Sequence, residues 1–315
     1  SINLKNTRRM FEACTSLVDL SGLKKWDVGN LENTTQMFNR CSSLTNLSDL
    51  EAWNISNVCN MANMFEKCKS LTDLTGLSNW DVGNVKNMSK MFNYCESLEN
   101  LDGLNDWNVE KLENINEMFR ICTNLSDISA LSTWNVSNLC NMRGTFERCE
   151  SLNDLTGLGD WNVMNLENTG MMFYHCTSLT ELTGLEDWNT PNLEKINQMF
   201  EGCTSLADIS ALANWNVSHV EYMRRVFKEC TSLTDISALA NWNVSNVKIL
   251  YSLFAKCSNL NDLTALANWN VKNVKDFAWM FHELKSLNDI SFLANWDMSN
   301  AQDLDYMFYK CKSLI

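Results

Sequence analysis

Thirteen cysteines carry the most reactive side chains of this 315-residue chain, and eleven of them recur every 27 residues. The series runs from Cys14 to Cys311, with Leu284 in one of its places. Such a series could supply disulfides, metal ligands or nucleophiles. Side chains at equal phase in stacked units point in the same direction, which suits a disulfide poorly. A zinc site needs paired ligands such as Cys-x-x-Cys or an accompanying histidine series, and neither is present. The sequence therefore predicts buried free thiols that pack as small hydrophobic side chains, and no metal site.

A second series with the same period places a carboxylate two residues before a hydroxyl. Like charges repeated at ~5 Å repel each other, so turn hydrogen bonds, a cation or a basic partner must offset the repulsion. Turn capping is the favoured interpretation, and a calcium column is disfavoured because no glycine-rich calcium-binding repeat is present. Contact with a partner is the remaining alternative. The candidate partner-contact residues in this series are Asp73, Thr75, Asp127, Ser129, Asp154, Thr156, Asp208, Ser210, Asp235 and Ser237.

Histidine-based catalysis finds no support in the chain. His175, His219 and His282 lie at three different phases of the repeat, in well-separated units. No serine, cysteine or carboxylate constellation accompanies them, and no phosphate-binding glycine loop appears. We therefore expect a protein that is not an enzyme, with no catalytic residues and no cofactor.

The elements that position these series are set by the tryptophans, which run from Trp26 to Trp296 at a constant interval of 27 residues. Only Trp279 lies outside that series, and the phenylalanines from Phe11 to Phe308 keep the same interval. A unit this short cannot bury its apolar side alone, whereas stacked units cover one another. The period therefore predicts one solenoid domain over 1–315, with about twelve coils, incomplete first and last repeats and no recognisable caps.

Within each unit the apolar spacing predicts a helix followed by a short strand. In the unit that begins at Trp80, five apolar residues fall on one helical face: Val85, Met88, Met91, Phe92 and Cys95. The spacing of Leu71, Leu74 and Leu77 is too sparse for a helix and fits a strand and a turn. Because strands repeat at ~4.8 Å and helices at ~8–10 Å, the helix side should be wider. The expected fold is an α/β solenoid that curves, with parallel strands on the inner face and one helix per coil outside.

Two segments carry the pattern W-N-V-S-N-V-x-x-M-x-x-M-F-x-x-C-x-S-L nearly whole, namely 53–71 and 134–152. This pattern resembles the BspA-like leucine-rich repeat, most closely its bacterial surface-lipoprotein variant. The resemblance extends over essentially the full chain. It implies a right-handed solenoid displayed on a cell surface, with adhesion or host-protein binding as its role and no shared catalytic residues.

The Asn or Asp that follows each internal Trp is similar to the asparagine ladder of leucine-rich repeats. We expect Asn108 and Asn135 to satisfy backbone groups at a turn, because each connection would otherwise bury unpaired amides. Trp80, Phe92 and Cys95 represent the other structural columns of the predicted stack.

The unit from Trp269 to Trp296 departs from the pattern at Phe277 and Trp279, and the unit from Trp215 carries Tyr222, Arg224 and Arg225. Exposed aromatic side chains in a regular array indicate contact sites, so Phe277 and Trp279 join the candidate contact residues. Approach to a cap is the alternative interpretation of the same irregularity.

The net charge of −13 argues against nucleic acid and against an anionic membrane surface. No apolar run approaches the roughly 18 residues of a membrane-spanning helix. We therefore predict an extracellular or cell-surface protein that binds a protein or a glycan. The alternative is a protomer of a filament or surface layer, in which solenoids associate end to end.

Overall fold

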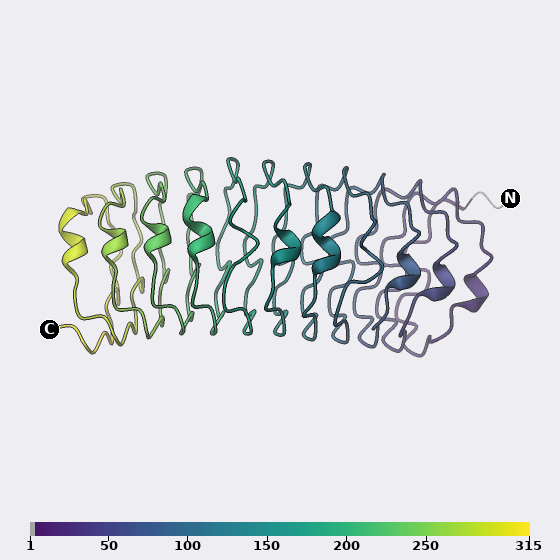
Figure 1. Ribbon diagram of the computed structural model, residues 1–315, viewed down its shortest axis with the longest axis horizontal. Coiled ribbons are helices and arrows are strands. Elements are labelled where there is room, and N and C mark those ends of the chain that lie inside the picture. Colours follow the sequence, from purple (N-terminus) through teal and green to yellow (C-terminus); the bar gives the residue numbers. More distant parts are fainter. Residues whose placement is uncertain (1–3) are drawn as a thin grey trace.

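The computed structural model describes residues 4–315 as a row of stacked coils, with the two ends of the chain at opposite ends of the row (Figure 1). Twelve parallel β-bridges join residues that are 27 positions apart, beginning with Asn6 and Asn33 on one side of the stack. The repeat period is thus the length of one coil, and the predicted solenoid is confirmed.

The helices of the described residues are nine short 3₁₀ helices, each of which begins at a Ser or Thr (Figure 1). Their bounds are η1 Ser21–Leu23, η2 Ser48–Leu50, η3 Thr75–Leu77, η4 Ser129–Thr133, η5 Thr156–Leu158, η6 Ser210–Asn214, η7 Ser237–Leu239, η8 Thr264–Leu266 and η9 Ser291–Asn295. The expected strand at Leu71–Leu77 is replaced by a bridge at Asp73 and by η3. The local cause is the hydrogen bond from the Leu77 N–H to the Leu74 carbonyl, 2.8 Å, which closes a tight turn.

The segment predicted to be helical forms what we call the turn ladder, residues 141–149 and their equivalents in the other coils. Its alternate N–H groups donate to the next coil, as Met142 does to Asn168, Phe146 to Met172 and Arg148 to Tyr174 at 2.7–3.0 Å. The N–H groups between them close turns three residues long, such as Cys149 to Phe146 at 3.0 Å. Every backbone donor from 144 to 149 is therefore used either within the coil or between coils.

The prediction of one α-helix per coil is therefore wrong, and the coil spacing explains why. Phenylalanine rings of successive coils stack with centroids 5.2–6.3 Å apart, whereas packed helices need about 8–10 Å. Left-handed residues such as Lys90 (φ 57°) and Tyr94 (φ 61°) also break any helix twice per coil. Turns that repeat every three or four residues bury the same apolar positions as a helix would. Without a wide helical layer, the expected cause of curvature is missing.

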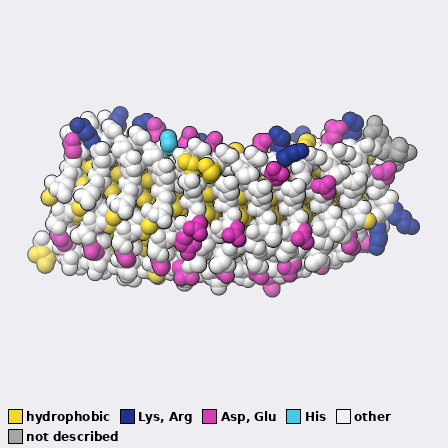
Figure 2. Space-filling view, turned by 45° about the horizontal axis from the view of Figure 1, so that its top comes forward, with side chains coloured by type: hydrophobic (Ala, Val, Ile, Leu, Met, Phe, Trp, Pro, Cys, Tyr) yellow, Lys and Arg dark blue, Asp and Glu magenta, His cyan; other side chains and the backbone are white. Residues whose placement is uncertain are grey.

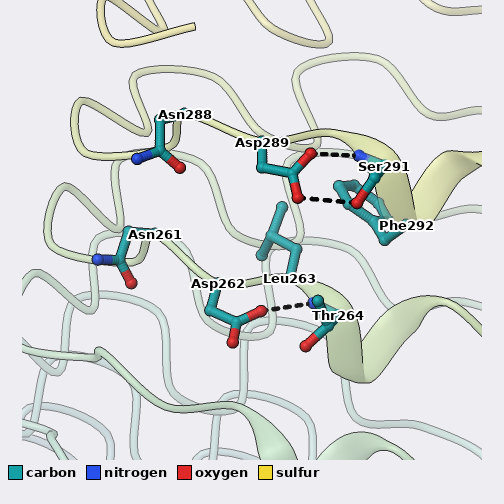
Figure 3. Close-up of a pocket in the computed structure, with 8 residues that line it drawn as sticks. All are labelled: Asn261, Asp262, Leu263, Thr264, Asn288, Asp289, Ser291 and Phe292. Carbon is teal, nitrogen blue, oxygen red and sulfur yellow. Dashed lines mark hydrogen bonds between the residues drawn. The ribbon is translucent and has the colours of Figure 1, made fainter.

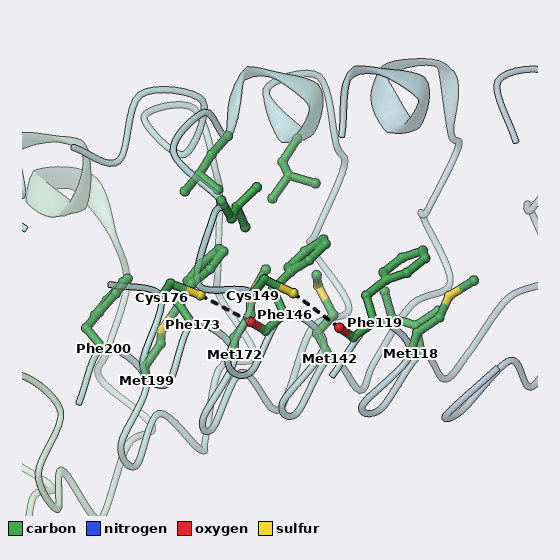
Figure 4. Packing of buried hydrophobic residues seen from close by; sticks show 14 of the residues in the cluster. Met118, Phe119, Met142, Phe146, Cys149, Met172, Phe173, Cys176, Met199 and Phe200 are labelled. Carbon is green, nitrogen blue, oxygen red and sulfur yellow. Dashed lines mark hydrogen bonds between the residues drawn. The ribbon is translucent and has the colours of Figure 1, made fainter. Parts of the chain in front are cut away.

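The core lies between the turn ladder and the 3₁₀ helices, and its columns run along the stack (Figure 4). Phe146 and Phe173 stack with rings 5.9 Å apart and 6° from parallel. The Cys149 thiol donates to the Phe119 carbonyl at 3.1 Å, and ten cysteines of the column make this bond at 3.0–3.3 Å. Apolar packing and one weak hydrogen bond per coil thus hold the cysteine column in register.

The tryptophans form a further buried column, with parallel rings such as Trp134 and Trp161, whose centroids lie 6.2 Å apart. The Trp161 indole N–H donates to the Leu131 carbonyl at 2.9 Å. The same bond recurs from Trp53 to Trp296 at 2.8–3.1 Å. Each indole therefore satisfies a buried carbonyl of the preceding coil, which fixes the register of successive coils.

Candidate functional site

The carboxylates of the predicted contact series stand directly before the 3₁₀ helices, and we call this surface the acidic face. It comprises Asp73, Asp127, Asp154, Asp208, Asp235, Asp262 and Asp289 with the Ser or Thr two residues after each. Asp73 Oδ1 accepts the N–H of Thr75 at 2.8 Å and its hydroxyl at 2.6 Å. The backbone bond recurs at all seven positions at 2.7–2.8 Å. Turn capping is thus the structural role of these carboxylates, and it holds each of them in a fixed orientation.

Hydrogen bonding also changes the acidity of this face. The pKa of Asp262 is lowered by the backbone N–H of Thr264, and the pKa of Asp289 is lowered by the hydroxyl and N–H of Ser291. Asp262 and Asp289 belong to successive coils and repel each other, which opposes part of the lowering at Asp262. The carboxylates of Asp262 and Asp289 therefore remain charged at neutral pH.

Hydrogen bonds tie successive coils together at only some positions of the acidic face. The N–H groups of Thr72 and Asp73 donate to Thr45, and those of Ser126 and Asp127 donate to Glu99. Within the part of the chain that the structure describes, Asp154 and its equivalents 235, 262 and 289 form no such backbone bond. The backbone ladder of this face is therefore incomplete.

Two clefts open between neighbouring coils where these bonds are missing. One, of about 440 Å³, lies between Asp127 and Asp154, with Asn153 on its wall. The other, of about 300 Å³, lies between Asp262 and Asp289 and includes the edge of Phe292 (Figure 3). Both are lined by carboxylate, amide and hydroxyl groups, a set that can accept and donate hydrogen bonds to a polar ligand. On the surface seen in Figure 2, acidic side chains recur along the whole stack, while basic ones gather near the upper edge and the N-terminal end.

The aromatic contact candidates, Phe277 and Trp279, are less exposed than the sequence predicts. Phe277 is fully buried and packs against Trp296 at 5.8 Å, so the prediction that it is an exposed contact residue is wrong. Phe277 occupies the same repeat position as Met142 and is a core residue like it. Trp279 is half-buried, with its ring 4.5 Å from Tyr306 and 4.6 Å from His282. It therefore belongs to an aromatic cluster that lies outside the acidic face.

The asparagines after each Trp close turns but are not turned inward. Asn108 accepts the N–H of Glu110 at 3.2 Å, Asn135 accepts that of Ser137 at 3.3 Å, and both side chains are exposed. Bonds between coils come instead from the asparagine three residues later. Asn138, for example, donates its side-chain amide to the Glu110 carbonyl at 2.8 Å.

A further column that sequence reasoning missed lies at the start of the turn ladder. Nine of its twelve members are Asn or Asp, and each accepts the N–H two residues later at 2.8–3.0 Å. Lys195, Tyr222 and Ile249 take the other three places, in successive coils. The 27-residue spacing of Asn33, Asn60 and Asn87 was a signal that could have revealed it.

All thirteen cysteines are free thiols. Burial raises the pKa of Cys41 and of Cys203 to about 12, so these thiols stay protonated at neutral pH and are poor nucleophiles. Among residues 4–315 no group of three or more His, Cys, Asp or Glu side chains is arranged to hold a metal ion. The same residues contain no helix long and apolar enough to cross a membrane.

The sequence matches the family described as "Mycoplasma protein of unknown function, DUF285" over residues 5–127, 97–210 and 207–315. The chain belongs to the DUF285 family. No curated protein matches this DUF285 chain.

Solved structures similar to this DUF285 chain include bacterial leucine-rich repeat proteins, the class of repeat that the sequence pattern resembles. A leucine-rich cell surface protein from Faecalibacterium prausnitzii is 16% identical, with a TM-score of 0.42 over 90% of this chain and 75% of that one. A leucine-rich repeat protein from Eubacterium ventriosum is 13% identical, with a TM-score of 0.38 over 87% and 82%. One from Bacteroides ovatus is 15% identical, with a TM-score of 0.28 over 90% and 81%.

Proposed function

We infer that this protein is a non-enzymatic recognition protein, displayed outside the cell, that binds a protein or glycan partner through its acidic face. The observation that carries the proposal is the pair of clefts between coils, at Asp127 and Asp154 and at Asp262 and Asp289. A surface that served only to cap turns would have no need of such openings.

The proposed face is pre-organised for binding. Each Asp already uses one or both carboxylate oxygens to fix its turn, so little side-chain freedom remains to be lost on association. The spare lone pairs of the carboxylates can accept hydrogen bonds from lysine, arginine or sugar hydroxyls. Repetition along the stack lets several weak contacts act together on one extended partner.

A block of charge-neutral substitutions tests this proposal without removing the caps. Asn46 and Asn100 occupy the capping position naturally, so Asp127→Asn, Asp154→Asn and Asp208→Asn should leave the turns intact. The triple variant and the wild type are compared for binding to an array of extracellular matrix proteins and glycans. We expect the variant to lose at least about tenfold in affinity for the wild-type ligands, equivalent to about 1.4 kcal/mol.

The matched control changes three capping aspartates that lie directly after a Trp, by Asp27→Asn, Asp81→Asn and Asp297→Asn. These side chains close the same kind of turn outside the acidic face. Equal binding by the acidic-face variant and the wild type would refute the acidic face as the binding surface, and equal losses in both variants would reduce the effect to net charge.

End-to-end association of solenoids into a filament or layer stays a prediction of the repeat pattern. Sedimentation velocity of the purified chain over a range of concentrations tests it, and a concentration-independent monomer would contradict it.

A further inference from the structure

The column at the start of the turn ladder changes character in three successive coils. In nine coils an Asn or Asp there accepts the N–H two residues later, as Asn141 accepts that of Arg143 at 3.0 Å. Lys195, Tyr222 and Ile249 cannot make this cap, and the Arg224 N–H instead uses the Asn197 side chain of the preceding coil at 2.9 Å. Three neighbouring coils have therefore given up a stabilising turn cap at the same phase.

The replacing side chains are large and reach the surface. Tyr222 is 40% exposed, so its ring is not part of the buried core. Lys195 and Arg224 are exposed, and Ile249 is half-buried beside Tyr222 across a parallel bridge. The Arg225 guanidinium lies over the Tyr251 ring, 5.4 Å from its centroid. We call these six residues, Lys195, Tyr222, Arg224, Arg225, Ile249 and Tyr251, the basic patch.

The charge of the basic patch is not neutralised within the chain. Nearby lysines are paired, as in Lys228 with Glu201 at 2.7 Å. Among the described residues, by contrast, Lys195, Arg224 and Arg225 have no carboxylate within 4.0 Å. The segments 194–202, 221–229 and 248–256 together hold six Lys or Arg and four Glu, a net charge of +2 in a chain of −13.

We propose that the basic patch is a second docking surface, and that its partner is a polypeptide segment that combines acidic and apolar side chains. Unpaired guanidinium groups bind carboxylates through two parallel hydrogen bonds. Tyr and Arg are the residue types most enriched where protein interfaces concentrate their binding energy. Ile249 offers apolar contact next to Tyr222, which favours a polypeptide over a uniformly polar anionic glycan. The patch lies on the turn ladder, whereas the acidic face lies at the 3₁₀ helices across the core, so the two surfaces can be occupied independently.

The chain offers a substitution set that removes three of the six patch residues and restores the regular ladder. Lys195→Asn, Tyr222→Asn and Ile249→Asn return the three coils to the residue found in seven of the other nine. This triple variant should melt at or above the wild-type temperature, because it provides acceptors for the N–H groups of Asn197 and Tyr251 while the Arg224 N–H already has one in Asn197. Any loss of binding therefore cannot be attributed to unfolding. A second variant, Arg224→Gln with Arg225→Gln, removes the two guanidinium charges and keeps Lys195 and the apolar side chains.

A control at the same phase is present eight coils away. Arg8 and Arg9 occupy the positions of Arg224 and Arg225, but their coil keeps Asn6 as its cap. The variant Arg8→Gln with Arg9→Gln therefore makes the same charge change outside the basic patch.

The probe is a fluorescently labelled random copolymer of Glu and Tyr, measured by anisotropy at physiological salt. We expect the wild type and the Arg8/Arg9 variant to bind it with affinities within about twofold, and both patch variants to bind at least about tenfold more weakly. No binding by the wild type, or unchanged binding by the Arg224/Arg225 variant, would overturn the proposal.

Heparin is the competing probe, and tighter wild-type binding to heparin than to the copolymer would assign the patch to an anionic glycan instead. The acidic-face variant Asp127→Asn, Asp154→Asn, Asp208→Asn should bind the copolymer at least as well as the wild type, which separates this surface from the first.

Discussion

The two sides of each coil are held together in different ways. On the turn ladder, up to four N–H groups per coil donate to the next coil, as the segment 142–148 shows, and an asparagine caps the first turn there. On the acidic face such bonds form at Asp73, Asp127 and Asp208 and are missing at Asp154 and Asp262. The turn ladder therefore provides most of the backbone hydrogen bonds that join successive coils, while the acidic face leaves polar groups free for other contacts.

The rates of thiol labelling should differ more than any other property of the two sides, because a thiol behind the turn ladder reacts only when the ladder unfolds. Cys149 is fully buried behind the turn ladder and its pKa is raised by burial, whereas Cys59 is exposed on the surface. In native buffer at pH 8 we expect iodoacetamide to modify Cys59 at least about a thousandfold faster than Cys149, since Cys149 must wait for unfolding. Mass spectrometry of the digested protein measures both rates. Comparable native rates would mean that the ladder side opens readily.

Truncation of the ladder-side core should cause the next largest effect. Phe146→Ala removes a ring that stacks on Phe119 and Phe173, and we expect the free energy of unfolding to fall by about 3–5 kcal/mol. Leu155→Ala on the acidic side removes a smaller buried side chain and serves as the comparison. Urea unfolding followed by tryptophan fluorescence measures both. If Leu155→Ala lowered the free energy of unfolding more than Phe146→Ala, the acidic side would contribute more to stability than the ladder side, contrary to this prediction.

Removal of a single turn cap should change the stability of the two sides by a smaller amount. Asn141→Ala deletes the acceptor of the Arg143 N–H, and we expect a loss of about 1 kcal/mol. Asp154→Asn keeps an acceptor for the Thr156 N–H and should change stability little. Thermal unfolding of the two variants distinguishes them, and equal melting temperatures would show that the ladder cap contributes nothing.

The smallest effect concerns pH. The folded pKa of Asp289 is lowered by Ser291, so its charged form stabilises the folded state. That contribution is complete above the ordinary aspartate pKa of about 3.9 and is lost as the pH falls through the lower folded value. The melting temperature of the wild type, relative to Asp289→Asn, should therefore decrease between pH 6 and pH 2. A difference that stays constant over this range would contradict the effect of Ser291.

Sequence reasoning predicted the period, the capping carboxylates and the buried thiols of the cysteine series, because each follows from which residue type recurs at which phase. Cys14 is the exception in that series, since it is exposed in the first coil. Trp134 and Cys149 could be assigned to columns from spacing alone. The local backbone could not, because apolar positions such as Val85, Met88 and Met91 suit a helix and a run of turns equally well. Left-handed residues such as Tyr94 and Lys90 carry ordinary side chains, and among the described coils glycine marks these turns only at Gly144 and Gly202.

The acidic clefts were not predicted, although the sequence carries a signal for them. Asp127 follows a coil with Asn100 at the same phase, whereas Asp154 follows a coil with Asp127, and the backbone bonds to the preceding coil form at the first and are missing at the second. The bonds also form at Asp73 and Asp208, which follow Asn46 and Glu181, so the residue one coil earlier distinguishes the two cases. The basic patch was only partly visible, since Tyr222, Arg224 and Arg225 stand out as irregular while the cap that Tyr222 replaces does not.

On the turn ladder, the N–H groups of Met142, Gly144, Phe146 and Arg148 donate towards the higher-numbered coil, whereas those of Cys140 and Asn141 donate to Glu113 in the lower-numbered coil. A coil therefore presents a different pattern of donors and acceptors on each of its two sides, so that the stack has a chemical polarity. Gain or loss of a whole unit at any coil boundary restores complementary rows, whereas an insertion of another length places donors opposite the wrong atoms. A change of length by whole units therefore preserves the bonds between coils, and two chains in reversed orientations would not present complementary groups to each other.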